Sequence, residues 1–115
     1  MNKLQFSRQY VVEDRYIEEF EGWNKLEIGK KFVATIHPDL EFSQIINEHH
    51  TITLLGYLIN PYKSNMSNKE IIKEISQNIS NFEDLIEETY CLSGRWVLIY
   101  QSGNIIRRIV VCDKF

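Results

Sequence analysis

The chain has 115 residues, 43% of them apolar and 25% charged, which is the composition of one ordinary globular domain with a modest core. Its net charge of −3 and its scattered basic residues argue against nucleic acid or an anionic membrane as the main partner, because phosphate binding needs clustered Lys and Arg. No apolar run reaches the length of a membrane span or of a signal-peptide core, which predicts a cytoplasmic protein.

The first half of the chain predicts β-strands. Residues 4–12 are rich in β-forming side chains, and "KLEIGKKFVATIH" indicates two short strands with Gly29 at the turn between them, ended by Pro38. "TITLLGYLIN", residues 51–60, predicts a strong strand that is apolar on both faces and ends before Pro61.

The middle of the chain predicts two helices that are nearly continuous. Ser67 and Glu70 form the pattern of a capping box at the start of the first. Its core stripe consists of Ile71, Ile72, Ile75 and Ile79. The second helix begins at a cap formed by Ser80 or Asn81. Its expected inner face consists of Phe82, Leu85, Ile86 and Thr89.

The end of the chain predicts a β-hairpin. In "RWVLIYQ", Trp96, Leu98 and Tyr100 alternate with Val97 and Ile99, and the following "SGN" supplies a turn with glycine. Both faces of each strand are apolar, which is typical of a sheet between two layers. We expect helices on one side of this sheet and another sheet on the other.

Two pairs of residues invite a metal or redox interpretation. Cys91 and Cys112 have apolar neighbours and wide spacing, which favours free buried thiols over a disulfide or a zinc site. The adjacent His49 and His50 would point to opposite faces of a strand, so a polar pair at a strand entry is expected rather than a metal site. We therefore expect no metal and no cofactor.

The order of motifs in the second half of the chain resembles a known family. "LLGYLIN", "MSNKEI", "LSGRWVLIY" and "VVCDKF" follow one another as do four motifs of the N-terminal glutaminase domain of asparagine synthetases and other class II amidotransferases. The resemblance is clearest over residues 51–115 and covers little more than half of the chain. It implies that residues 1–115 form a single domain of α+β class, with antiparallel sheets and two helices in a shortened α-β-β-α sandwich, the Ntn-hydrolase-like fold.

The resemblance also shows which catalytic groups differ. The family's nucleophile is an N-terminal cysteine, where this chain has Asn2, and its oxyanion hole aligns with Leu55 and Gly56, of which only Gly56 keeps a donor. Gly56 is equally well explained as a bulge or close backbone approach. The family's anchor for the substrate's amine aligns with Asn68. Asn60 and Asn68 are the candidate substrate-binding residues.

The sequence therefore predicts a non-hydrolytic, glutaminase-like domain of an asparagine-synthetase-related protein. It would dock a partner or bind an amino acid such as glutamine, and the expected partners are a second copy or a synthetase-like protein. The alternative is an active glutaminase that supplies ammonia for amide transfer. The resemblance further implies that residues 4–12 lie beside residues 51–59, with Met1 near Gly56.

Overall fold

The computed structural model describes residues 10–13, 21–62 and 65–112. Residues 111 and 112 are described by their backbone alone. Its contacts divide the chain into two compact units, residues 1–41 and 42–115. The described elements comprise two helices and two antiparallel sheets, so the α+β class is confirmed. That residues 1–115 form a single domain stays a prediction.

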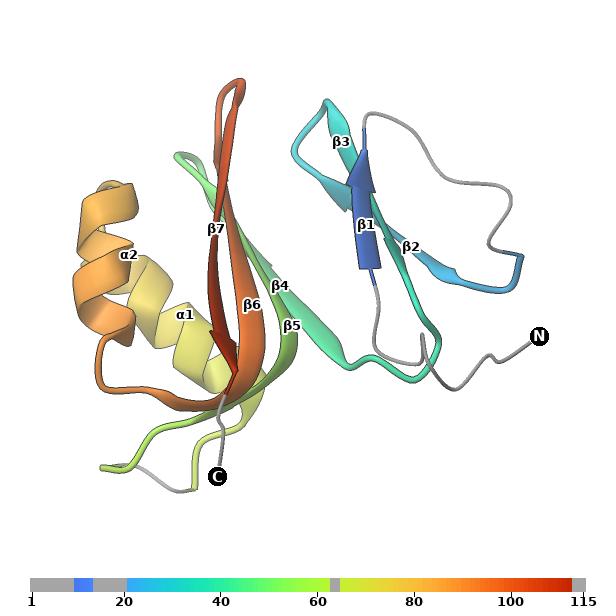
Figure 1. The fold of residues 1–115 in the computed structure, drawn as a ribbon. Helices are drawn as coiled ribbons and strands as arrows, with labels where there is room; N and C mark the ends of the chain where they lie inside the picture. The colour runs from blue at the N-terminus through green and yellow to red at the C-terminus, as the bar shows by residue number, and fades with distance from the viewer. Residues whose placement is uncertain (1–9, 14–20, 63–64, 113–115) are drawn as a thin grey trace. The chain divides into compact units, whose positions relative to one another are not determined.

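The first unit holds a three-stranded antiparallel sheet (Figure 1). Strands β2 (Asn24–Ile28) and β3 (Phe32–Ile36) form the predicted hairpin, and Gly29 takes a φ of 65° in its turn. β1 (Tyr10–Glu13) pairs with the other edge of β3. The rest of the predicted first strand lies outside the described residues.

The second unit holds a four-stranded antiparallel sheet in the order β4-β5-β6-β7. Its strands are β4 (Phe42–Ile46), β5 (Thr51–Ile59), β6 (Ser93–Ser102) and β7 (Ile105–Cys112). β6 pairs with β5 along the whole length of β5, whereas β4 pairs only as far as Leu55. Among the described strands, the last part of β5 therefore has a neighbour on one edge only.

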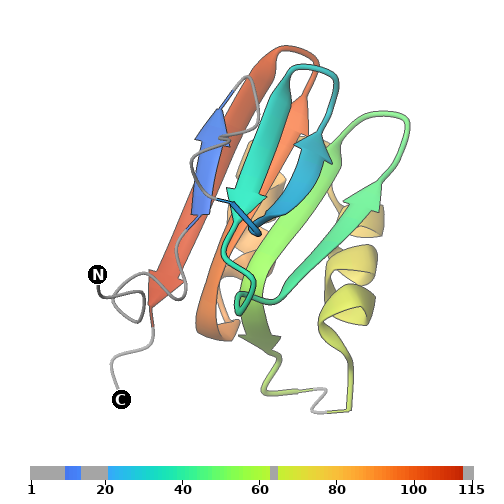
Figure 2. The same ribbon diagram turned by 90° about the vertical axis from the view of Figure 1, so that its right-hand side faces the viewer.

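Both helices lie on one face of this sheet (Figure 1), and Figure 2 shows α1 behind β4 and β5. α1 (Asn68–Asn78) begins with the predicted capping box between Ser67 and Glu70, and α2 (Phe82–Thr89) begins at Asn81. No helix in the described part of the chain is long and apolar enough to cross a membrane.

The core of the second unit lies between the helices and the sheet, as the apolar stripes predict. The sheet contributes the side chains that the register places on the helix face, and α1 contributes its isoleucine stripe. Burying one such aliphatic side chain contributes about 1.5–3 kcal/mol. The buried members are Ile52, Leu54, Leu58, Ile71, Ile72, Ile75, Ile79, Leu85, Trp96, Leu98 and Tyr100. That a second sheet covers the opposite face stays a prediction.

The pairing expected for the first strand is wrong in its described part. Tyr10–Glu13 pairs with β3 and not with Thr51–Ile59. The physical reason is that β4, which the sequence analysis did not predict, takes one edge of β5 while β6 takes the other. Met1 lies outside the described residues, so its distance from Gly56 stays untested.

Two expectations of burial are also wrong. Ile86 was placed on the inner face of α2, but its side chain is 46% exposed, because Leu85 and Thr89 turn toward the core instead. Cys91 is a free thiol, as predicted, yet it is exposed, because the next residue, Leu92, is the one that packs against the core. The side chain of Cys112 lies outside the described residues.

Candidate functional site

The second half of β5 approaches β6 unusually closely. Gly56 has a φ of 97°, and a Cβ at this position would lie 2.3 Å from the carbonyl oxygen of Arg95. Gly94 repeats the feature on β6, where a Cβ would lie 2.5 Å from the carbonyl oxygen of Tyr57. Both positions therefore need glycine, for their backbone conformation and for the contact. The close approach accounts for Gly56 without any catalytic role.

Asn68 completes the edge of β5 where β4 has ended. Its side-chain oxygen accepts a hydrogen bond of 3.0 Å from the backbone N–H of Leu58, and its amide nitrogen lies 3.4 Å from the carbonyl oxygen of Gly56, to which it donates. These are the two groups on either side of Tyr57 that a neighbouring strand would otherwise satisfy. The Asn68 carboxamide thus replaces a peptide group of the absent strand, and both of its polar atoms are bonded to the backbone.

Asn60 has a different partner. Its side-chain oxygen accepts a hydrogen bond of 2.9 Å from the backbone N–H of Tyr62, which is the geometry of an Asx turn across Pro61. The structure therefore brings Asn68 to Gly56, whereas Asn60 stabilises its own turn. Leu55, the other position of the expected oxyanion hole, is buried and has no polar side-chain atom.

A polar cluster that the sequence analysis missed lies at the opposite end of β5. Asn47 and His50 close the turn between β4 and β5, and the Ser76 side chain on α1 contacts both of them. The amide nitrogen of Asn47 lies 3.0 Å from Nε2 of His50 and 3.0 Å from Oγ of Ser76. Nε2 of His50 lies 3.0 Å from the same Oγ. We call these three residues the His50 cluster.

The backbone fixes the proton positions in the His50 cluster. The side-chain oxygen of Asn47 accepts hydrogen bonds from the backbone N–H groups of His49 and His50, at 2.8 and 2.9 Å, so its amide nitrogen must face the imidazole. An amide nitrogen only donates, so Nε2 of His50 is an acceptor. The neutral ring therefore carries its proton on Nδ1. That Nδ1 is buried and has no hydrogen-bond partner among the described residues.

The surroundings of His50 favour the neutral imidazole. Burial lowers its pKa below the ordinary value of 6.5, and the charge of the neighbouring His49 lowers it further. The Tyr100 ring, whose centroid is 5.5 Å from that of the imidazole, supplies no countercharge. Protonation would direct an N–H of the ring at the Asn47 amide, donor against donor. The cluster is therefore more stable while His50 is neutral.

The chemistry available to the His50 cluster is limited by access. Ser76 and His50 form a hydroxyl–imidazole pair of the kind that activates a nucleophile, but their side chains are only 6% and 4% exposed. In the described part of the chain, no third group orients the ring at Nδ1. The pair holds α1 to the β4–β5 turn and does not present a reactive hydroxyl to solvent.

The described residues contain no set of side chains that could bind a metal ion. No group of three or more His, Cys, Asp or Glu side chains there could hold an ion. His49 is exposed and His50 is buried, as expected for neighbours that face opposite ways at the entry to β5.

Comparison of the chain with protein-family models, with curated proteins and with solved structures found no match. Two signals could have revealed the His50 cluster: the Asn-x-x-His spacing of a turn at residues 47–50, and a serine four residues after Ile72 on the buried stripe of α1.

Proposed function

We propose that this chain is a non-hydrolytic module, glutaminase-like in plan, that docks a partner protein. The observation that supports it most is the state of Asn68, the residue expected to anchor the amine of glutamine. Both polar atoms of its side chain are bonded to the backbone of β5. Binding an amino acid there would break these bonds and leave the Leu58 N–H without a partner, which costs about 1–3 kcal/mol.

The reactive groups that a glutaminase needs are also replaced. Leu55 stands at the oxyanion position and cannot donate a hydrogen bond, and loss of one such donor costs on the order of a hundredfold in rate. The nucleophile position, Asn2, lies outside the described residues and has no nucleophilic side-chain atom. The one Ser–His pair of the described residues, Ser76 and His50, is buried.

The finer fold belongs to the same proposal. A shortened α-β-β-α sandwich requires a sheet with helices on one face and an apolar opposite face. The helices cover one face of the second unit's sheet, and the other face carries Leu55, Val97 and Ile99, with the polar Thr53 and Arg108 beside them in register. The pairing of β1 with β3 departs from the plan expected of the family, so the likeness is argued from the second unit.

The test is a glutaminase assay combined with a binding measurement. The purified full chain is incubated with glutamine, and ammonia and glutamate are measured against buffer and against the heat-denatured chain. We expect no release above background and no rise in melting temperature with glutamine. Ammonia release above background would overturn the proposal, as would a glutamine-dependent rise in melting temperature that Asn68→Ala abolishes.

A further inference from the structure

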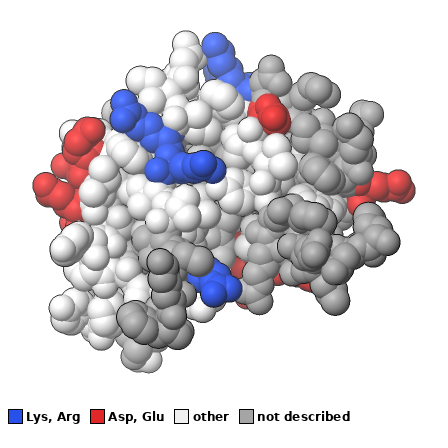
Figure 3. Space-filling model, viewed as in Figure 1, with Lys and Arg blue, Asp and Glu red and all other residues white. Residues whose placement is uncertain are grey.

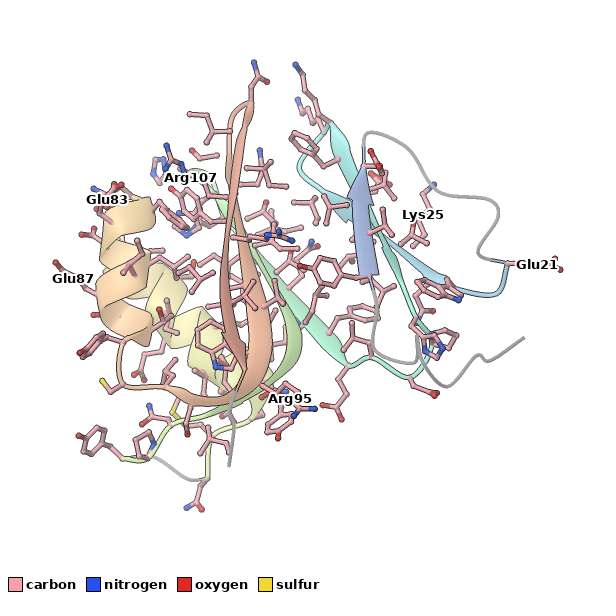
Figure 4. The ribbon with its side chains drawn as sticks, in the orientation of Figure 1. Glu21, Lys25, Glu83, Glu87, Arg95 and Arg107 are labelled. Atoms are coloured by element: carbon pink, nitrogen blue, oxygen red, sulfur yellow. The ribbon has the colours of Figure 1, made fainter. Side chains whose placement is uncertain are left out.

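The outer surface of α2 carries an exposed apolar pair beside an acidic pair. Ile86 is 46% exposed and Tyr90, at the end of the helix, is 89% exposed, and they lie four residues apart. Glu83 and Glu87 are exposed at the same spacing, and Figure 4 shows both directed away from the sheet. We call Glu83, Ile86, Glu87 and Tyr90 the α2 stripe.

Local stability explains only one of the two charges of the α2 stripe. Glu83 lies in the first turn of α2, where the helix dipole favours an acid, whereas the position of Glu87 has no such explanation. Glu83 and Glu87 are like charges at i,i+4, which destabilises a helix by about 0.2–0.5 kcal/mol. Glu87 also lies near the C-terminal end of α2, where the helix dipole disfavours an acid, and the last turn has no basic residue. Figure 3 shows acidic side chains at the left-hand margin, where α2 lies.

The carboxylates of the α2 stripe also lack cationic partners within the described part of the chain, where neither forms an ion pair with Lys or Arg. Arg107, on the adjoining strand β7, instead stacks its guanidinium over the Phe82 ring, 5.5 Å from the ring centroid. The α2 stripe therefore combines exposed apolar area with uncompensated negative charge, a local conflict that is expected at sites shaped by function rather than stability.

We propose that the α2 stripe binds a basic amphipathic helix of a partner protein. This inference rests on the proposed docking function and names the surface and the kind of partner. The apolar and acidic pairs form two parallel ridges, each at i,i+4 spacing, and this pattern matches a helix that carries aliphatic and Lys or Arg residues at the same spacing. The cations of the partner would lie against Glu83 and Glu87, and its aliphatic side chains against Ile86 and Tyr90.

The charge of the α2 stripe selects this occupant over a second copy of the chain. In a symmetric dimer built on α2, Glu83 and Glu87 of one copy would face the same residues of the other, and like-charge contacts across an interface cost several kcal/mol. The same charge opposes nucleic acid and anionic membranes. A basic helix is the occupant that compensates the acids and covers the apolar pair together.

The test uses two synthetic helical peptides of equal Leu and Lys content. One segregates Leu and Lys on opposite faces, and the other has the same residues in scrambled order. Each is titrated into the ¹⁵N-labelled full chain, and backbone shifts are followed in 50 and 300 mM salt. We expect the segregated peptide to shift residues 82–91 selectively and to bind at least about tenfold more weakly at the higher salt.

Matched variants separate this surface from general acidity. Glu83→Gln with Glu87→Gln should weaken binding about tenfold, and Ile86→Ala with Tyr90→Ala by a similar factor. The controls are Glu21→Gln with Glu41→Gln, which makes the same change in net charge, and Ile46→Ala with Tyr62→Ala, which removes apolar side chains that are 71% and 82% exposed. These should change the affinity less than twofold.

The outcomes distinguish this inference from the proposed function. Equal binding of the two peptides, shifts spread over other acidic surfaces, or dilution-dependent shifts of α2 without peptide would each overturn the inference, the last by identifying a second copy as the occupant. If one of these three outcomes is found and glutamine is not hydrolysed, the proposed docking function would stand, but the docking surface would be a different one from the α2 stripe. Glutamine hydrolysis would overturn the proposed function, whatever the peptides do.

Discussion

The two ends of β5 are both held by α1, but with different chemistry. At the end near Leu58, Asn68 in the first turn of α1 supplies a carboxamide that no change of pH in the physiological range alters. At the other end, Ser76 in the last turn of α1 meets the titratable ring of His50. α1 thus holds one end of β5 through a contact that does not depend on pH, and holds the other end more firmly while His50 is neutral.

The two ends of β5 also differ in whether the polar side-chain atoms of Asn68 and His50 are all hydrogen-bonded. Asn68 uses both its oxygen and its amide nitrogen on the β5 backbone. Nδ1 of His50 is buried without a partner among the described residues, and an unsatisfied buried polar group costs about 1–3 kcal/mol. At the Leu58 end both polar atoms of the Asn68 side chain are hydrogen-bonded, and we call this the saturated end. The His50 end keeps one buried polar atom without a partner among the described residues.

The largest expected effect is at the saturated end. Gly56→Ala would place a Cβ 2.3 Å from the Arg95 carbonyl oxygen in a backbone conformation with a φ of 97°. We expect the free energy of unfolding to fall by about 3 kcal/mol or more, measured by urea denaturation. The matched control is Gly103→Ala, where φ is also positive, at 59°. Apart from its chain neighbours, an added Cβ at Gly103 would have no described atom within 4 Å. Similar losses in the two variants would contradict the close approach of β5 and β6.

A smaller effect, dependent on pH, is expected at the His50 end. Because the pKa of His50 is lowered in the folded chain, the unfolded chain binds more protons below about pH 6.5, and folding is disfavoured there. The free energy of unfolding should therefore fall as pH decreases from 7.5 to 5.5, by less than about 1.4 kcal/mol per pH unit, the limit for one proton. Urea denaturation at several pH values measures it.

Two variants assign the pH dependence to His50, and the lowered pKa of Glu70 keeps that carboxyl group from contributing in the measured range. His50→Gln should remove most of the dependence, and His49→Gln should retain most of it, since burial of His50 is the larger cause of the shift. The pKa of Glu70 is lowered below its ordinary value of 4.5 by hydrogen bonds from the backbone and hydroxyl of Ser67, so its contribution is lost only below the measured range. A dependence unchanged in His50→Gln would show that another group titrates.

The sequence predicts those parts of the fold that local chemistry decides. The capping box at Ser67 and Glu70, the isoleucine stripe of α1 and the glycine turn of the β6–β7 hairpin each occupy a few consecutive residues, and the structure confirms them. The side-chain alternation around Leu98 sets the register in the same way. These signals need no information from distant parts of the chain.

The parts that failed depend on distant residues. β4 has no strict alternation in "FSQII", and it forms because β5 offers it an edge. Ile86 fits the helical period of an inner face, but α2 turns Leu85 and Thr89 inward instead. The His50 cluster joins residues 26 positions apart, which no short motif encodes. The role of Asn68 likewise requires knowledge of where β4 ends.

The central claim is that the Asn68 carboxamide completes the edge of β5. Its most direct test is hydrogen exchange of the Leu58 backbone N–H, followed by NMR. The exchange rate is compared between the native chain and Asn68→Ala, each with and without glutamine. Beyond Leu55 no strand of the described residues pairs with that edge of β5, and the Leu58 N–H is bonded to the Asn68 oxygen, which we expect to protect it. The account predicts slow exchange in the native chain, at least about tenfold faster exchange in Asn68→Ala, and no effect of glutamine. Equal rates in the two chains, or exchange that glutamine accelerates in the native chain alone, would contradict it.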